Sequence, residues 1–198
     1  VEVAVAENFS CALLLTGEVK CWGKNDYGQL GIGNTNSIGD GTGEMGNNLT
    51  AVPFSSTIKV QSLGAGGINT CATLTNGTVK CWGQNSSGQL GQGNTTDVGS
   101  TTSSMLSLNH IRLRQERSRA IYSGMGHTCA ILEDHKIQCW GKNDNGQLGL
   151  GDTTNRGDNS NEMGQNLPYV DLGSGAQVMQ LALGSNHTCA LITIDIPE

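Results

Sequence analysis

The sequence has few aromatic and few charged side chains, and the charge it carries is mostly acidic. Aromatic residues make up 4% and charged residues 14% of the 198 residues, and the net charge is −6. A nucleic-acid binder normally has a basic excess, because the release of counterions from phosphate drives its affinity. No apolar run reaches the ~20 residues that a membrane-spanning helix needs. We therefore expect no nucleic-acid partner and no membrane span.

The sequence also lacks an initiating methionine and an N-terminal targeting segment. It opens on Val1, so we expect a processed protein or a fragment. Glycine, in contrast, is abundant at 29 residues, and Ser, Thr and Asn fill much of the remainder. This composition disfavours helices and favours short strands joined by many turns, so the predicted class is all-β.

A unit of about sixty residues occurs in three complete copies, and a fourth copy is present in part. Each complete copy has a Cys-Ala start, a second cysteine followed by Trp-Gly, and then Asn-x-x-Gly-Gln-Leu-Gly-x-Gly. The complete hairpin stretches are Cys11–Gly23, Cys71–Gly83 and Cys129–Gly141, and Cys189 opens the fourth. We assign the chain to a single segment with approximate repeats at 1–58, 59–117, 118–176 and, in part, 177–198.

The pattern within each copy predicts a β-hairpin. In the second copy, two apolar runs flank the turn Thr75-Asn76-Gly77. A three-residue loop ending in glycine suits a type I turn with a G1 bulge, in which the glycine is left-handed. The third copy has His135 at that position, so its turn should be more strained. A hairpin centred on Asn76 places the first cysteine of the copy directly opposite the second.

This register predicts a disulfide in every complete copy. Directly opposed residues lie about 4.5–5.5 Å apart at Cα, within disulfide range, and each short loop should gain no more than about 2–3 kcal/mol from its bridge. Disulfides imply an oxidising compartment, whereas in a cytosolic protein the same cysteines would be small buried hydrophobes. We favour the bridges Cys11–Cys21, Cys71–Cys81 and Cys129–Cys139, with Cys189 unpaired.

A turn-rich stretch follows each hairpin and buries one leucine (Leu30, Leu90 or Leu148). A long loop and an extended segment come next. About four strands per sixty residues is typical of one blade of a β-propeller. A lone blade cannot bury both of its faces, so the copies must stack.

These stretches resemble the RCC1-type (regulator of chromosome condensation) repeat. The matching parts are His-Thr-Cys-Ala at 127–130 and 187–190, and Cys-Trp-Gly-x-Asn-x-x-Gly-Gln-Leu-Gly-x-Gly at 21–33, 81–93 and 139–151. The resemblance implies a seven-bladed β-propeller with four antiparallel strands per blade. With about 3.5 blades present, we expect the remainder of the ring to come from a longer chain or another subunit. The name-giving member implies nucleotide exchange on a Ran-type GTPase with chromatin binding.

Six Asn-x-Ser/Thr sequons occur, and in a secreted eukaryotic protein such sites accept glycans on surface loops. In so Asn-rich a chain several arise by chance, and Asn76 is well placed at a hairpin tip. The candidate glycosylation sites are Asn8, Asn48, Asn76, Asn85, Asn94 and Asn186.

The one basic cluster consists of Arg112, Arg114, Arg117 and Arg119. An anionic partner or a sulfated glycan would suit it, although we favour a solvated loop.

The long loops of copies one and three share the pattern Gly-Asp-x-x-x-Glu-Met-Gly. Its carboxylates, Asp40, Glu44, Asp158 and Glu162, are a weak candidate for calcium. We favour Asx-turns for the aspartates and solvated glutamates, and we expect neither a metal nor a cofactor.

No residue set points to catalysis. His127 and Cys129 share a strand face, as do His187 and Cys189, in the manner of a Cys–His nucleophile. The corresponding position is Phe9 in copy one, so the blade does not depend on histidine. The tryptophans Trp22, Trp82 and Trp140 are interpreted as packing against the next blade rather than as sugar platforms.

We therefore predict a non-enzymatic, extracellular or cell-surface module that binds another protein or self-assembles, with glycans as a further class of partner. The alternatives are a guanine-nucleotide exchange factor for a Ran-type GTPase, and a secreted enzyme inhibitor or carbohydrate-binding propeller. A count of free thiols separates the first prediction from the exchange factor.

Overall fold

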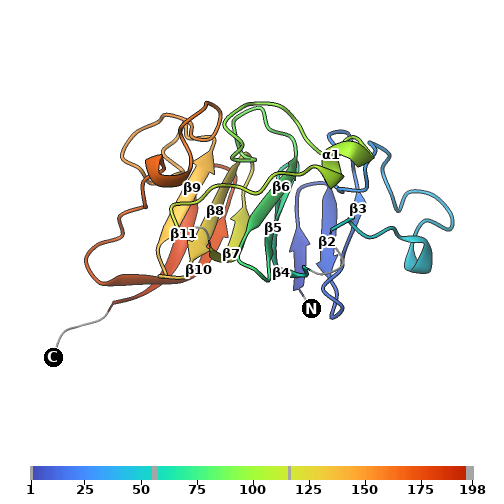
Figure 1. Ribbon diagram of the computed structural model, residues 1–198, viewed down its shortest axis with the longest axis horizontal. Coiled ribbons are helices and arrows are strands. Elements are labelled where there is room, and N and C mark those ends of the chain that lie inside the picture. Colours follow the sequence, from blue (N-terminus) through green and yellow to red (C-terminus); the bar gives the residue numbers. More distant parts are fainter. Residues whose placement is uncertain (1, 55–57, 116, 195–198) are drawn as a thin grey trace.

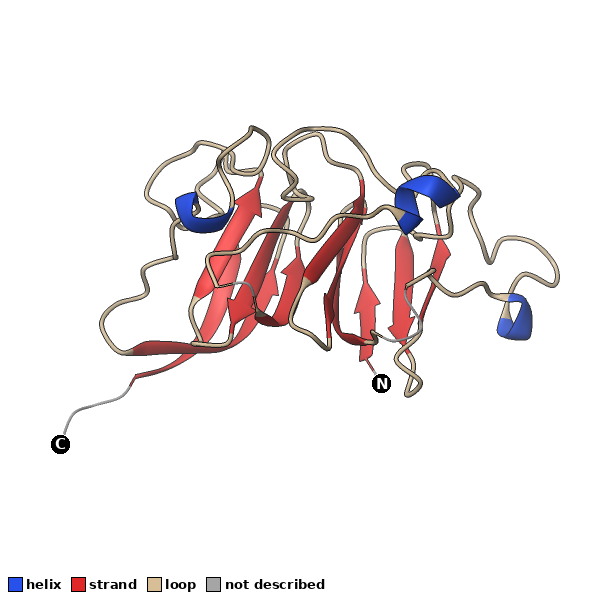
Figure 2. Ribbon diagram, in the orientation of Figure 1, coloured by secondary structure: helices blue, strands red, loops and turns tan. Residues whose placement is uncertain are grey.

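The computed structural model describes residues 2–54, 58–115 and 117–194. It consists of antiparallel sheets that stand side by side in chain order, from the N-terminal sheet in blue to the C-terminal hairpin in red (Figure 1). Strands form the body of the molecule, and the short helices lie within the loops (Figure 2). The predicted all-β class and the stacking of the copies as propeller blades are confirmed.

Each complete copy contributes a three-stranded sheet in chain order, and the last copy contributes a two-stranded hairpin. The strands are β1 (Glu2–Val5), β2 (Phe9–Leu13) and β3 (Val19–Gly23), then β4 (Val60–Gly66), β5 (Asn69–Leu74) and β6 (Val79–Gly83), then β7 (Ser118–Ser123), β8 (His127–Leu132) and β9 (Ile137–Gly141), and finally β10 (Ala176–Leu183) and β11 (Thr188–Ile194). Among the described residues the helices are η1 (Gly46–Asn48), α1 (Thr102–Leu106) and η2 (Gly164–Asn166).

The hairpin turns have the predicted geometry. Gly17 and Gly77 have φ angles of 78° and 84°, and His135 has a φ of 62°. The histidine thus takes the left-handed conformation that costs an L-residue more than glycine. In all three hairpins the first cysteine pairs directly with the second.

The fourth strand of each blade differs from the prediction. In copy two, Val79 pairs with Ile111 and Gly83 pairs with Val98, but only as isolated bridges. Ile111 and Val98 are 13 residues apart in the chain, whereas their partners are 4 apart. The intervening loop leaves the sheet edge between the two bridges, so a continuous outer strand cannot form.

The hydrophobic cores lie between neighbouring sheets. Residues from two successive copies share each core: Leu30 of copy one packs with Leu63 and Trp82 of copy two, Leu90 of copy two with Ile121 and Trp140 of copy three, and Leu148 of copy three with Val178 and Leu181 of copy four. A sheet therefore completes its burial only with a neighbour, as predicted for stacked blades.

The first strands of the successive sheets contact one another in series. β1 contacts β4, β4 contacts β7, and β7 contacts β10. Gly64 and Gly66 permit this approach, because a Cβ at either position would meet the backbone of β7 at Ser123. In the described part of the chain, no helix is both long enough and apolar enough to span a bilayer.

Candidate functional site

Each complete blade carries one cross-strand disulfide. The bonds Cys11–Cys21, Cys71–Cys81 and Cys129–Cys139 join directly paired residues whose Cα atoms are 4.1 Å apart. The six cysteines are at most 1% exposed and lie in the cores between blades. Cys189 is free and exposed. The structure therefore has the pairing that the hairpin register predicts.

Neighbouring blades are joined at the glutamine of Gly-Gln-Leu-Gly. The backbone oxygen of Gln29 accepts hydrogen bonds from Trp82 Nε1 at 3.0 Å and from Thr70 Oγ1 at 2.8 Å in the next blade. Trp140 and Thr128 donate in the same way to Gln89, each at 3.0 Å. Trp82 and Trp140 are fully buried, so these two serve packing and are not available as sugar platforms.

An asparagine shortly after each Trp-Gly closes the loop that follows. Asn85 is fully buried. Its Oδ1 accepts from the backbone N–H of Leu90 at 2.9 Å, and its Nδ2 donates to the carbonyls of Asn94 at 2.8 Å and Thr96 at 3.1 Å. Asn25 and Asn143 hold the same bonds in the other copies. No role was predicted for these asparagines or glutamines from the sequence, although their recurrence in all three copies was a usable signal.

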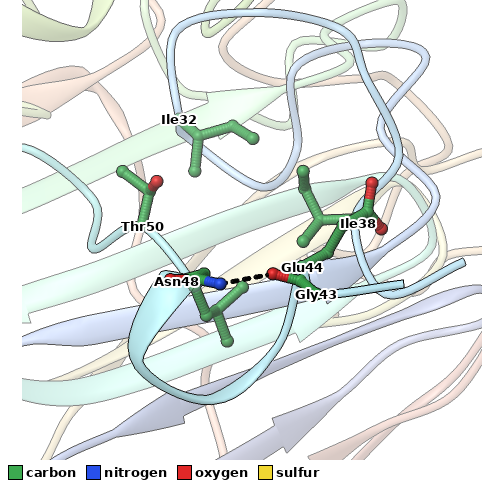
Figure 3. Close-up of a pocket in the computed structure, with 7 residues that line it drawn as sticks. Ile32, Ile38, Gly43, Glu44, Asn48 and Thr50 are labelled. Atoms are coloured by element: carbon green, nitrogen blue, oxygen red, sulfur yellow. Dashed lines mark hydrogen bonds between the residues drawn. The ribbon is translucent and has the colours of Figure 1, made fainter. Parts of the chain in front are cut away.

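The candidate glycosylation site at Asn85 is corrected by this finding. Its buried amide is fully used inside the loop, so the folded protein does not present it to solvent. The other candidates, Asn8, Asn48, Asn76, Asn94 and Asn186, are exposed. Asn48 lines a small surface pocket, where its Nδ2 donates to the Gly43 carbonyl at 2.6 Å (Figure 3).

The carboxylates of the long loops bind backbone N–H groups. Glu44 Oε2 accepts from Gly39 and Gly41, each at 2.8 Å, and these bonds lower the pKa of its carboxyl. Glu162 repeats the arrangement with Gly157 and Asn159 at 2.9 and 3.0 Å. The glutamates thus hold their loops closed, rather than being simply solvated as expected.

The calcium interpretation gains nothing from this arrangement. Among the described residues, no group of three or more His, Cys, Asp or Glu side chains is placed to hold a metal ion. Asp158 lies beside Glu162, and its pKa is raised by burial and by that neighbouring carboxyl. Asp40 is exposed.

The histidine–cysteine pairs do not form a nucleophilic site at copy three. Cys129 is bonded to Cys139, so it has no thiol to activate. His127 is fully buried and its Nε2 lies 3.0 Å from Thr188 Oγ1. Burial, reinforced by the charge of His187, lowers the pKa of His127 to about 4. This ring is therefore a neutral group of the core between blades three and four.

The arginine cluster divides into two parts. Arg119 turns to the hairpin tip, where its Nη1 lies 2.8 and 2.9 Å from the ring nitrogens of His135. Arg112, Arg114 and Arg117 line a groove of about 1270 Å³, whose walls come from copies two and three. We call this the arginine groove. The sequence placed the arginines together but could not show which of them share a surface.

Comparison with known proteins identifies the repeat. A family model described as "Regulator of chromosome condensation (RCC1) repeat" matches residues 1–29, 60–89 and 119–147, and a second model with this description matches 134–191. The ultraviolet-B receptor UVR8 of Arabidopsis thaliana is 32% identical over 90% of this chain. The probable E3 ubiquitin-protein ligase HERC4 of Homo sapiens is 30% identical over 97%. The chain spans 36% of UVR8 and 16% of HERC4.

A solved structure shares the fold over the full length of the chain. Prp20p from Saccharomyces cerevisiae superposes with a TM-score of 0.69 at 15% identity, covering 100% of this chain and 44% of Prp20p. At this identity the likeness speaks for the fold alone. Together with the repeated Trp–Gln junctions and the matched family models, it shows that the chain belongs to the RCC1 repeat family of β-propellers.

Proposed function

We propose that this chain is a non-enzymatic protein-interaction or assembly module that works outside the cell or on its surface. The observation that carries this proposal is the repeated buried disulfide, one in each complete blade. Disulfides persist in oxidising compartments and are rare in reducing ones. A role in binding is supported by the architecture, because the closed loops stand on a rigid stack of sheets and offer a fixed surface to a partner.

Glycans on the exposed asparagines belong to the same proposal. Asn76 lies at the tip of the β5–β6 hairpin, and its Oδ1 accepts from the N–H of Thr78 at 3.1 Å and from its hydroxyl at 2.8 Å. The amide nitrogen, which would carry the sugar, has no such bond among the described residues.

A count of alkylated cysteines, read from the intact mass, tests the proposal together with the location of the protein. The cells that make the protein are treated with iodoacetamide at harvest, and the chain is then denatured without reductant. We expect one alkylated cysteine, at Cys189, and seven after reduction. We also expect the native protein in the medium or at the surface. Seven thiols alkylated without reduction, in a protein confined to the cell interior, would contradict the extracellular proposal.

A further inference from the structure

The arginine groove is a basic surface on an acidic protein. Arg112, Arg114, Arg117 and His110 line it, and Glu133 is the one carboxylate among the described residues of its lining. The whole chain has 17 acidic residues against 11 basic ones. Positive charge is therefore gathered here rather than spread, and a field of this kind steers anionic groups to the surface.

Two of the three arginines have no partner in the described part of the chain. No ion pair and no side-chain hydrogen bond involves Arg112 or Arg117 there. Arg114 is held in place: its Nη2 donates to the Gln165 carbonyl at 2.6 Å, and its guanidinium lies 5.1 Å from the ring centre of Tyr169. The groove thus offers one oriented guanidinium and two free ones.

The blade fold does not require these arginines. The backbone N–H of Ile111 donates to Val79, as Val170 does to Ile137 in copy three. The position after this residue is Arg112 in copy two and Asp171 in copy three, so the charge is reversed at an equivalent place. Because the charge at this position is positive in one copy and negative in another, the repeat fold does not depend on it. The arginine is therefore free to serve another purpose.

The size and chemistry of the groove favour one kind of occupant. Its volume of about 1270 Å³ exceeds the ~300–1,000 Å³ of sites for small molecules, so it accommodates an extended segment. No Phe, Tyr or Trp side chain lines it among the described residues, although single-stranded nucleic acids are bound by stacking on such rings. Amide side chains such as Gln165 and the apolar Met163 also line it, which suits a peptide with a polar backbone and an occasional apolar side chain.

We propose that the arginine groove binds an acidic peptide segment of a protein partner. Arg112 and Arg117 receive its carboxylates, and Arg114, whose Nη2 is held by the Gln165 carbonyl, adds a guanidinium charge of fixed position. This inference rests on the proposed role as a protein-interaction module and gives the chemistry of one partner surface.

Fluorescence anisotropy with a labelled twelve-residue peptide of glutamate, alanine and leucine tests the proposal. We expect saturable binding that weakens with added salt, and at least tenfold weaker binding to the double variant Arg112→Ser/Arg117→Ala. The matched control Lys24→Ser/Lys142→Ser removes the same charge from side chains already paired with aspartates. It should change the affinity less than twofold. Unchanged denaturant midpoints show that both variants fold.

Three outcomes overturn the inference. They are the absence of saturable binding, an equal loss in both double variants, and tighter binding of a heparin oligosaccharide or an oligonucleotide of equal charge. The proposed function is judged separately, because capture of a natural partner that survives Arg112→Ser/Arg117→Ala would keep the interaction module and reject only this groove.

Discussion

His127 shows how one position can differ between copies without changing the blade. Its ring is fully buried, and copy two places Asn69 at the same point, also fully buried. Asn69 Nδ2 reaches Ser123 Oγ at 3.4 Å, much as His127 reaches the next blade at Thr188. Each side chain makes a polar contact across a core, but only the histidine can take up a proton, with an ordinary pKa of 6.5.

We predict that this histidine makes the fold sensitive to acid. Its folded pKa of about 4 lies below the ordinary value of 6.5, so below pH 6.5 the unfolded chain binds a proton that the folded chain does not. The contribution of His127 to the free energy of unfolding is therefore constant above pH 7. It falls as the pH drops, by up to about 1.4 kcal/mol per pH unit, and levels off near pH 4.

The variant His127→Asn isolates this contribution, because copy two shows that the position accepts asparagine. Denaturant unfolding of both proteins between pH 7.5 and 5 should show a stability difference that shifts in favour of the variant by about 2 kcal/mol at pH 5. If the free energy of unfolding changed with pH in the same way for both proteins, protonation of His127 would not destabilise the fold.

At the scale of the element, the loop after each hairpin depends on its buried asparagine. Asn85 satisfies one N–H and two carbonyls of a segment that has no regular secondary structure of its own. Buried polar backbone groups left without a partner cost about 1–3 kcal/mol each. The loop therefore keeps its shape through one side chain.

We expect Asn85→Ala to lower the free energy of unfolding by roughly 3 kcal/mol or more, since it leaves three backbone groups unsatisfied. The neighbouring Ser86 is exposed, and Ser86→Ala should change stability by less than about 0.5 kcal/mol. Thermal and denaturant unfolding of both variants provide the comparison. Similar small losses in both would assign the loop's stability to its glycines instead.

The same element marks the limit of what the sequence could predict. The hairpin, its left-handed turn residue and the cysteine register follow from local spacing, because a β-turn fixes which residues face each other. The role of Asn85 could not be read locally, since its partners lie 9 and 11 residues further on. Its sequon instead indicated a surface site. The arginine groove was equally hidden, because its walls come from two copies.

At the scale of the whole molecule, stability depends on how the blades meet. In stacked repeats, each unit contributes its own stability and an interface with its neighbours. Gly88 lies at such an interface: a Cβ there would collide with the backbone of Gly157 and Asp158 in the next blade. Gly146 occupies the same place in copy three, yet its nearest atom would be 4.0 Å away.

This pair of glycines separates the blade interface from the local turn. Their φ angles are 78° and 75°, so an alanine at either position carries the same left-handed cost of about 1–2 kcal/mol. Gly88→Ala must also displace the neighbouring blade, which adds about 1–3 kcal/mol. We therefore expect Gly88→Ala to destabilise more than Gly146→Ala, as measured by denaturant unfolding. Because the turn is matched, the difference reports the contact between blades two and three. If both variants lost the same free energy of unfolding, the neighbouring blade would move aside at no cost. The disulfides and loop hydrogen bonds within each blade would then dominate the stability of the stack.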